Sequence, residues 1–246
     1  MLKSLIFKKI TFKNYLPQEF NKILKKNGLF LFPSGPGLAL LDKNKSYHKS
    51  LIQADHVFFD SGFFVLLLKI FKNIKVQKFS GYLFIRYFIK HLLVNKNKKI
   101  ISVDPNFNFS KSNYNFFLKI GLKKKNIINY VSPIYDNSNI KDKKLLNIIK
   151  LYKPDYVLIN IGGSTQEILG LYIKKNIKVR KYKIICTGAA ISFFTGDQAP
   201  INVFFDKFFL GWLIRILFNP KLYLLRYIRA TKLCFLVFKE KVIIKL

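Results

Sequence analysis

The chain has 246 residues, of which half are hydrophobic and 16% are aromatic. This apolar content excludes intrinsic disorder and fits one large α/β domain, or one domain with a C-terminal appendage. With 44 Lys and Arg against 12 Asp and Glu, the formal net charge is +32, which favours nucleotide phosphates, nucleic acid or anionic lipid as partners. Because the lysines are spread through every segment, a solvated cationic surface explains the charge equally well.

The sequence predicts neither a membrane span nor a metal site. No window reaches the roughly 18 uninterrupted apolar residues of a spanning helix, and the N-terminal segment shows no secretory cleavage pattern. We therefore expect a cytoplasmic protein that touches the inner face of the bacterial membrane. Cys186 and Cys234 fit small buried residues better than a disulfide, and His48, His56 and His91 lack ligand spacing. Neither a metal nor another cofactor is expected.

In chain order, short apolar runs alternate with longer amphipathic ones, a pattern typical of β-α-β construction. A helix is predicted over residues 140–152, where five apolar side chains share one face, and Pro154 follows its end. The predicted strands each end near Pro, Gly, Asp or Ser, where a parallel sheet carries its functional loops. They cover residues 29–32, 56–59, 99–103, 127–131, 156–161 and 183–187.

The pattern changes after residue 199, which divides the sequence into an α/β domain (1–199) and a C-terminal appendage (200–246). The appendage contains two helical stretches separated by Pro220, and residues 242–244 fit a final strand. On the second helix, Lys221, Arg226 and Arg229 oppose an apolar side. Such a basic stripe suits anionic lipid headgroups or a diphosphate, although a solvated basic face explains it about equally well.

Residues 54–62 (ADHVFFDSG) place Asp60 after a predicted buried strand, and Gly62 frees the backbone to turn. An acid at this edge of an α/β sheet could act as general base on an acceptor hydroxyl. The alternative, which the pattern alone favours, is that Asp60 caps the helix that begins near Phe63.

Residues 160–167 (NIGGSTQE) lead from a predicted strand into paired glycines, Gly162 and Gly163. Ser164 or Thr165 can cap the next helix, and backbone N–H groups at such a start favour phosphate. Gln166 offers a donor and an acceptor to a nucleotide sugar, but a plain turn explains the segment too. Gly188 lies near the start of a further segment, residues 187–200 (TGAAISFFTGDQAP), whose small residues after a strand let a ligand approach the backbone closely. They also let a helix pack tightly on the sheet, and the pattern alone favours packing.

Together these segments resemble the WecG/TagA/CpsF family, glycosyltransferase family 26. Its acidic "ADLVxPDG" segment is similar to residues 54–62, and its "ERVxGxD" segment to residues 77–83 (QKFSGYL). Its "GxPxQE" turn is similar to residues 162–167, and its "GVGAxFDFxAG…RAP" stretch to residues 187–200. The "GLEWLxRL…EPxR…R" tail is similar to residues 210–215 (LGWLIR), 219–220 and 226–227. The five segments occur in the family's order between residues 29 and 230.

The resemblance implies a Rossmann-like, mostly parallel sheet flanked by helices, with a helical basic appendage that helps close the site at the membrane. It also implies an inverting, metal-independent transfer of an N-acetylmannosamine-type sugar from a UDP-sugar to a polyprenyl-diphosphate-linked acceptor. Asp60 would be the general base, and an oligomer is compatible with the sequence. Donor and diphosphate contacts would come from Ser34, Lys78, Gly162, Gly163, Ser164, Gln166, Gly188, Arg215, Lys221 and Arg226.

Several positions depart from the family pattern. Phe32 and Ser34 stand where the family has Thr and Asn, and Asp104-Pro105 follow Val103 where a Gly pair is expected. Gln198 and Gly211 replace an Arg and a Glu. These changes motivate an alternative, a catalytically degenerate member that binds nucleotide sugar or lipid. A nucleic-acid-binding protein is a second alternative, motivated by charge alone, because no RRM, KH, zinc-finger or homeodomain pattern is present and nucleic acid is not an expected partner.

Overall fold

A computed structural model describes residues 2–177, 182–197, 217 and 220–246. Their strands form one sheet in the order β6-β5-β7-β8-β3-β4-β2-β1-β9. All neighbours from β6 to β2 pair in parallel, whereas β1 pairs antiparallel with both β2 and β9. The strands are β1 (Ser4–Phe7), β2 (Ile10–Lys13), β3 (Gly28–Leu31), β4 (His56–Phe58), β5 (Ile100–Asp104), β6 (Ile127–Val131), β7 (Tyr156–Ile159), β8 (Lys183–Cys186) and β9 (Val242–Lys245).

The α/β prediction is confirmed, and all seven predicted strands are present within two residues of their expected ends. The hairpin of β1 and β2 was not predicted. Its turn residues, Lys8 and Lys9, have positive φ angles of 47° and 65°. Such two-residue turns ordinarily carry Gly, Asn or Asp, so two lysines give no turn signal in the sequence.

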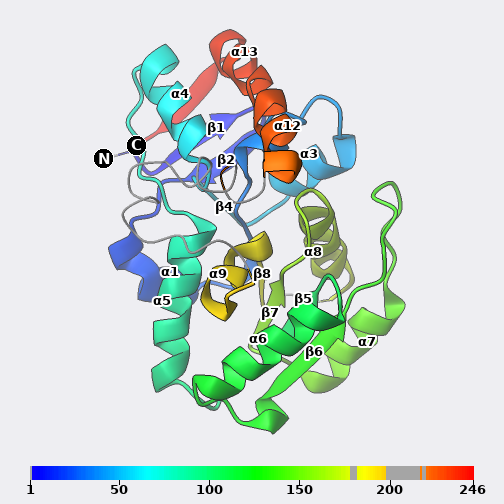
Figure 1. The fold of residues 1–246 in the computed structure, drawn as a ribbon. Coiled ribbons are helices and arrows are strands. Elements are labelled where there is room, and N and C mark those ends of the chain that lie inside the picture. Colours follow the sequence, from blue (N-terminus) through cyan, green and yellow to red (C-terminus); the bar gives the residue numbers. More distant parts are fainter. Residues whose placement is uncertain (1, 178–181, 198–216, 218–219) are drawn as a thin grey trace.

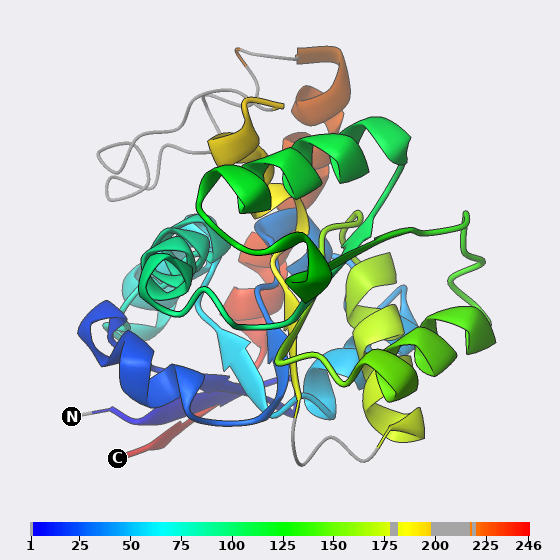
Figure 2. The same cartoon turned by 90° about the horizontal axis from the view of Figure 1, so that it is seen from below.

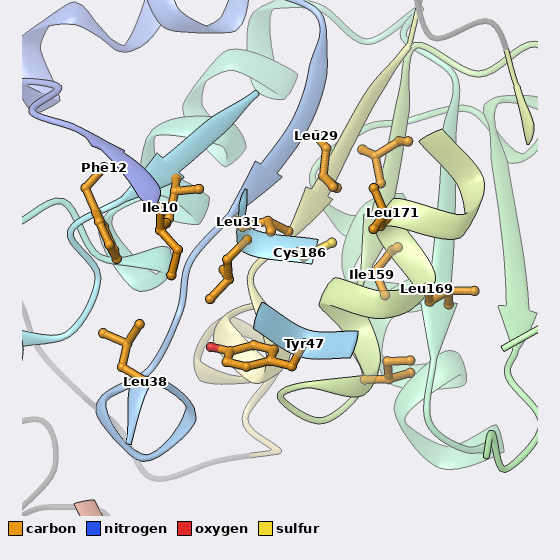
Figure 3. Packing of buried hydrophobic residues seen from close by; sticks show 14 of the residues in the cluster. Ile10, Phe12, Leu29, Leu31, Leu38, Tyr47, Ile159, Leu169, Leu171 and Cys186 are labelled. Carbon is orange, nitrogen blue, oxygen red and sulfur yellow. The ribbon is translucent and has the colours of Figure 1, made fainter. Parts of the chain in front are cut away.

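Helices cover both faces of the sheet (Figures 1 and 2). Successive strand residues alternate between two cores: Leu29 and Leu31 belong to one, Phe30 and Phe32 to the other. The first core is completed by α2 (Gly35–Leu38), α3 (Lys45–Ile52), α4 (Gly62–Lys72), α7 (Lys143–Tyr152), α8 (Thr165–Asn176) and α13 (Lys232–Lys239). Figure 3 shows part of this core around Tyr47. The second is completed by α1 (Phe20–Leu24), α5 (Gly81–Val94), α6 (Phe107–Lys119) and η4 (Gly188–Ala190).

The predicted helix at 140–152 is observed as α7, with its start shifted to Lys143. The Asp142 carboxylate accepts a hydrogen bond from the Leu145 backbone N–H at 2.8 Å and so caps the helix. Lys153 adopts a left-handed conformation at the C-terminal end, directly before Pro154. Leu145, Leu146 and Ile149 are buried, as the apolar face of the pattern predicted.

In the region predicted as an appendage, the described residues form α12 (Pro220–Ala230), α13 and β9. The predicted final strand is present and joins the sheet beside β1, so the two ends of the chain lie together (Figure 1). α13 packs on α4 through buried Leu233 and Val237. Within the described ranges, no helix combines the length and apolar character needed to cross a bilayer.

Candidate functional site

Four neighbouring parallel strands, β7, β8, β3 and β4, bring their carboxyl ends to one edge of the sheet. The loops that follow them therefore meet there. They contain Gly162 and Gly163 after β7, Gly188 after β8, Ser34 after β3 and Asp60 after β4. The acid and the glycine pair, 102 residues apart in the sequence, thus lie at one edge of the sheet.

Asp60 does not cap α4. Ser61 occupies that position, and its hydroxyl accepts a hydrogen bond from the Phe64 N–H at 3.2 Å. The Asp60 carboxylate, which is partly buried, instead accepts the backbone N–H of Gly81 at 2.7 Å. Gly81 is the first residue of α5, so the positive end of that helix faces the acid.

Gly81 also joins the loop after β8. A Cβ atom on Gly81 would lie 3.4 Å from the Cβ of Thr187, so the two backbones approach closely. The buried hydroxyl of Thr187 has no hydrogen-bond partner among the described residues. The segment before α5 is fixed next to β4 by a bond from the Phe79 N–H to the Phe59 carbonyl. Lys78, a predicted donor contact, precedes Phe79 and is thereby held near Asp60.

Ser34 caps the short helix α2 through a bond from the Gly37 N–H to its hydroxyl. Gly35 lies against Ser61, because an added Cβ would be 2.9 Å from the Ser61 hydroxyl oxygen. At Gly37, an added Cβ would be 2.7 Å from the hydroxyl of Tyr47. The loop after β3 therefore packs directly on the loop that carries Asp60.

The glycine pair borders open space. Both Gly162 and Gly163 are exposed, and a Cβ on either would meet no atom within 4 Å. Ser164 holds the N-cap position of α8 at φ 66°, but its side chain makes no capping bond. Thr165 does not cap either; its hydroxyl donates to the Asn137 side chain at 2.7 Å. The predicted side-chain cap is therefore wrong. Most N–H groups of the first turn already have partners within the turn: that of Gln166 donates to the Gly162 carbonyl and that of Ile168 to the Ser164 carbonyl.

Gln166 and Glu167 lie behind this turn and are almost fully buried. The Gln166 amide oxygen accepts the Gly188 N–H at 2.7 Å, and its nitrogen donates to the Glu167 carboxylate at 3.1 Å. Burial raises the pKa of Glu167 to about 7, and the negative charge of Asp60 adds to the rise. Gln166 thus connects the loops after β7 and β8, and two carboxyl groups lie within electrostatic reach of each other.

A buried polar cluster lies around Asp104, at the carboxyl end of the neighbouring strand β5. The fully buried Asp104 carboxylate accepts hydrogen bonds from Ser102, Asn113 and Asn160 at 2.7–2.9 Å and from Asn129 at 3.3 Å. Burial raises the pKa of Asp104, although these donors oppose the rise. The cluster joins β5, β6, α6 and the end of β7, and Asn160 leads directly into the glycine pair.

The predicted C-terminal contacts are only partly described. Lys221 is exposed at the start of α12. This helix packs on α2, the short helix that Ser34 caps. Arg226 belongs to α12, but its side chain lies outside the described part of the structure, and so do residues Arg215, Gln198 and Gly211.

Among the positions that depart from the family pattern, Phe32 is described. It is buried and stacks on Phe58, with ring centroids 4.2 Å apart. An aromatic contact thus occupies the position where the resemblance to the family implies Thr.

The pattern reasoning missed three site residues. Tyr47 carried no recognisable signal. Thr187 lies in the quoted 187–200 stretch but was not singled out, because its place depends on which loops the fold brings together. Glu167 lies within the "GxPxQE"-like turn, but its burial could not be inferred from the sequence.

Within the described residues, no three His, Cys, Asp or Glu side chains are grouped as metal ligands would be.

A sequence profile of the "Glycosyl transferase WecG/TagA/CpsF family" matches residues 4–245, essentially the whole chain. The chain belongs to this family. No curated protein matches it. Family membership makes it a hexosyltransferase of cell-surface polysaccharide synthesis, with a nucleotide-sugar donor and a lipid-linked acceptor in general. The match includes the hairpin at the start of the chain and the strand at its end, so the entire sheet belongs to the WecG-type fold.

Proposed function

We propose that this WecG-type enzyme transfers an N-acetylmannosamine-type sugar from UDP to a polyprenyl-diphosphate-linked acceptor, with inversion and without a metal. The observation that supports this is the convergence of Asp60, the Gly162–Gly163 turn and Gln166 at one sheet edge. The open space at the glycines lets a sugar diphosphate approach the backbone of α8.

In the proposed reaction, Asp60 takes the proton of the acceptor hydroxyl as its oxygen bonds to the anomeric carbon. The bond from that carbon to the diphosphate breaks, and UDP leaves with the electron pair. Ser34, Lys78, Gln166, Gly188 and residues 162–164 hold the donor. Arg215, Lys221 and Arg226 offset the diphosphate charge of the leaving group or of the acceptor.

A panel of UDP-sugars tests the donor class. A ligand that binds only the native state stabilises it by about 2.7 kcal/mol at one hundred times its Kd, so the matching UDP-sugar should raise the melting temperature by several degrees. Transfer of the radiolabelled sugar to a polyprenyl-diphosphate-linked acceptor should follow. GDP-sugars serve as the control; stabilisation by these, and by no UDP-sugar, would contradict the proposal.

We further propose that the enzyme binds the inner face of the membrane through an apolar ridge, formed by Leu66, Ile70 and Phe71 on α4 and Phe235 and Phe238 on α13. All five side chains are at least 41% exposed, and the Phe71 and Phe238 rings contact each other at 5.8 Å. Lysines flank the ridge: the Lys72 ammonium donates to the Phe238 carbonyl, and that of Lys239 lies 5.9 Å from the Phe235 ring. Apolar side chains beside cations suit an anionic bilayer surface.

Replacing both Phe235 and Phe238 with Ser should weaken binding to phosphatidylglycerol vesicles at least about tenfold, because each buried aromatic ring contributes on the order of 1.5–3 kcal/mol. Co-sedimentation measures the change. The matched control replaces Val94 and Leu151, which are apolar and even more exposed but lie on α5 and α7. If both double variants bind vesicles as the unmodified enzyme does, the ridge is not the membrane contact.

A further inference from the structure

Tyr47 is the exception among the buried tyrosines of this enzyme. It lies on α3, is 1% exposed, and its hydroxyl has no hydrogen-bond partner among the described residues. The other two buried tyrosines in the described ranges each have one: the Tyr130 hydroxyl donates to the Asp142 carboxylate at 2.8 Å, and the Tyr156 hydroxyl lies 2.9 Å from Nε2 of His91. A buried hydroxyl without a partner is destabilising, so native proteins rarely keep one without a functional reason.

Packing alone does not require this hydroxyl. The core around Tyr47 contains phenylalanines at the same depth, including Phe59 and Phe64, which are at most 1% exposed. The hydroxyl also occupies space that the neighbouring loop must leave free. A Cβ on Gly37 would lie 2.7 Å from the hydroxyl oxygen, so a residue other than glycine would push the ring aside. A phenylalanine at position 47 would fill the core and remove this conflict.

The hydroxyl points into the loop after β3, next to Ser34. Figure 3 shows it directed toward Leu38 on α2. The same Cβ position on Gly37 lies 3.3 Å from the Ser34 hydroxyl oxygen, so the two hydroxyls border one small region. Ser34 is only partly buried and lies at the sheet edge of the candidate site. It therefore adjoins both the buried Tyr47 hydroxyl and the surface that a ligand can reach.

We propose that Tyr47 is a positioning residue for the sugar donor, whose hydroxyl donates to the Ser34 hydroxyl when Ser34 binds the donor. This inference rests on the proposed function, in which Ser34 contacts the donor. In the structure the Ser34 oxygen accepts a long bond, 3.3 Å, from the Gly37 N–H. A hydroxyl has two acceptor lone pairs and one proton, so Ser34 can also accept from Tyr47 and donate its own proton to a diphosphate oxygen. Burial raises the pKa of Tyr47 well above its usual range, so its hydroxyl keeps the proton that this bond needs.

The bond from Tyr47 would hold the Ser34 side chain in the orientation that faces the donor. A chain of hydrogen bonds that ends on a charged oxygen polarises each of its members, so the bond from Ser34 to the diphosphate becomes stronger. Without the donor, Ser34 has no charged acceptor to turn toward, and the Tyr47 hydroxyl stays unpaired. Tyr47 thus improves donor binding without touching the donor and without stabilising the ligand-free fold.

Tyr47→Phe removes the hydroxyl and leaves the ring. In isothermal titration calorimetry, the Kd for UDP-N-acetylmannosamine should rise about three- to tenfold, the usual effect of losing one uncharged hydrogen bond. The melting temperature without ligand should stay the same or rise, because the group that is removed had no partner. Tyr156→Phe is the matched control. Its hydroxyl has a partner and lies at the opposite edge of the sheet, so this variant should melt about 2–4 °C lower and bind the donor normally.

A double-mutant cycle with Ser34→Ala tests whether Tyr47 acts through Ser34. Tyr47→Phe should weaken donor binding in the unmodified enzyme but not in the Ser34→Ala background. An equal loss in both backgrounds overturns the positioning role. So does a lower melting temperature of Tyr47→Phe with unchanged donor binding, which would make the hydroxyl purely structural. If the unmodified enzyme binds no UDP-sugar, the proposed function fails together with this inference, whereas normal binding by both the unmodified enzyme and Tyr47→Phe overturns the inference alone.

Discussion

Replacing Asp60 with Asn should reduce kcat for sugar transfer by about 10²–10⁴-fold, the usual effect of removing a general base. The substituted amide keeps an oxygen that can accept the Gly81 N–H, so the start of α5 should stay in place. Binding of the UDP-sugar should persist, because the proposed donor contacts lie on other residues. Steady-state transfer of a radiolabelled sugar measures kcat, and thermal shift measures donor binding.

The control for this variant is Asp42→Asn, which removes an exposed carboxylate that pairs with Lys8 and lies outside the site. Its kcat should equal that of the unmodified enzyme. A folded Asp60→Asn protein that transfers sugar at the normal rate would exclude Asp60 as the base. Loss of donor binding together with loss of rate would instead assign Asp60 to the binding of the donor.

Replacing Asp104 with Ala should lower the free energy of unfolding by at least about 3 kcal/mol. The substitution removes the shared acceptor of four donors. Asn160 and Asn129 keep bonds to Ser102 and Ser110, whereas the Ser102 hydroxyl and the Asn113 amide lose their acceptor, and each buried unsatisfied group costs on the order of 1–3 kcal/mol. Urea denaturation measures the change. Asp42→Ala, which removes only an exposed ion pair, should cost less than about 1 kcal/mol. Equal stability of the two variants would show that Asp104 is not a structural centre.

The parts of this enzyme that follow from local pattern were predictable. The predicted positions of β3, β5 and β7 were correct because these strands are short apolar runs bounded by turn residues. The prediction of α7 was correct because its apolar side chains recur with helical periodicity. The hairpin of β1 and β2 was missed because two lysines, and no glycine, form its turn, and because its pairing with β4 and β9 joins segments far apart in the sequence.

In the candidate site, too, some features could be predicted from the sequence and others could not. Asp60 and the glycine pair were placed together because parallel strands deliver their ends to one edge. The partner of Asp60 could not be foreseen, since the bond to Gly81 depends on how α5 is set against β4. The burial of Glu167 depends on α3 packing across α8, a contact between elements more than one hundred residues apart in sequence. Such information is tertiary, and no local window contains it.

The position of β9 restricts how this enzyme can be shortened. Cutting the chain after Asn219 removes α12, α13 and β9 together, which uncovers α4 and leaves β1 as an open sheet edge. An uncovered edge pairs readily with other chains, so the shortened protein should self-associate. Point substitutions on α13 thus report on lipid binding more cleanly than truncation does. Because β1 and β9 are neighbours, affinity tags at either terminus emerge from the same corner of the molecule.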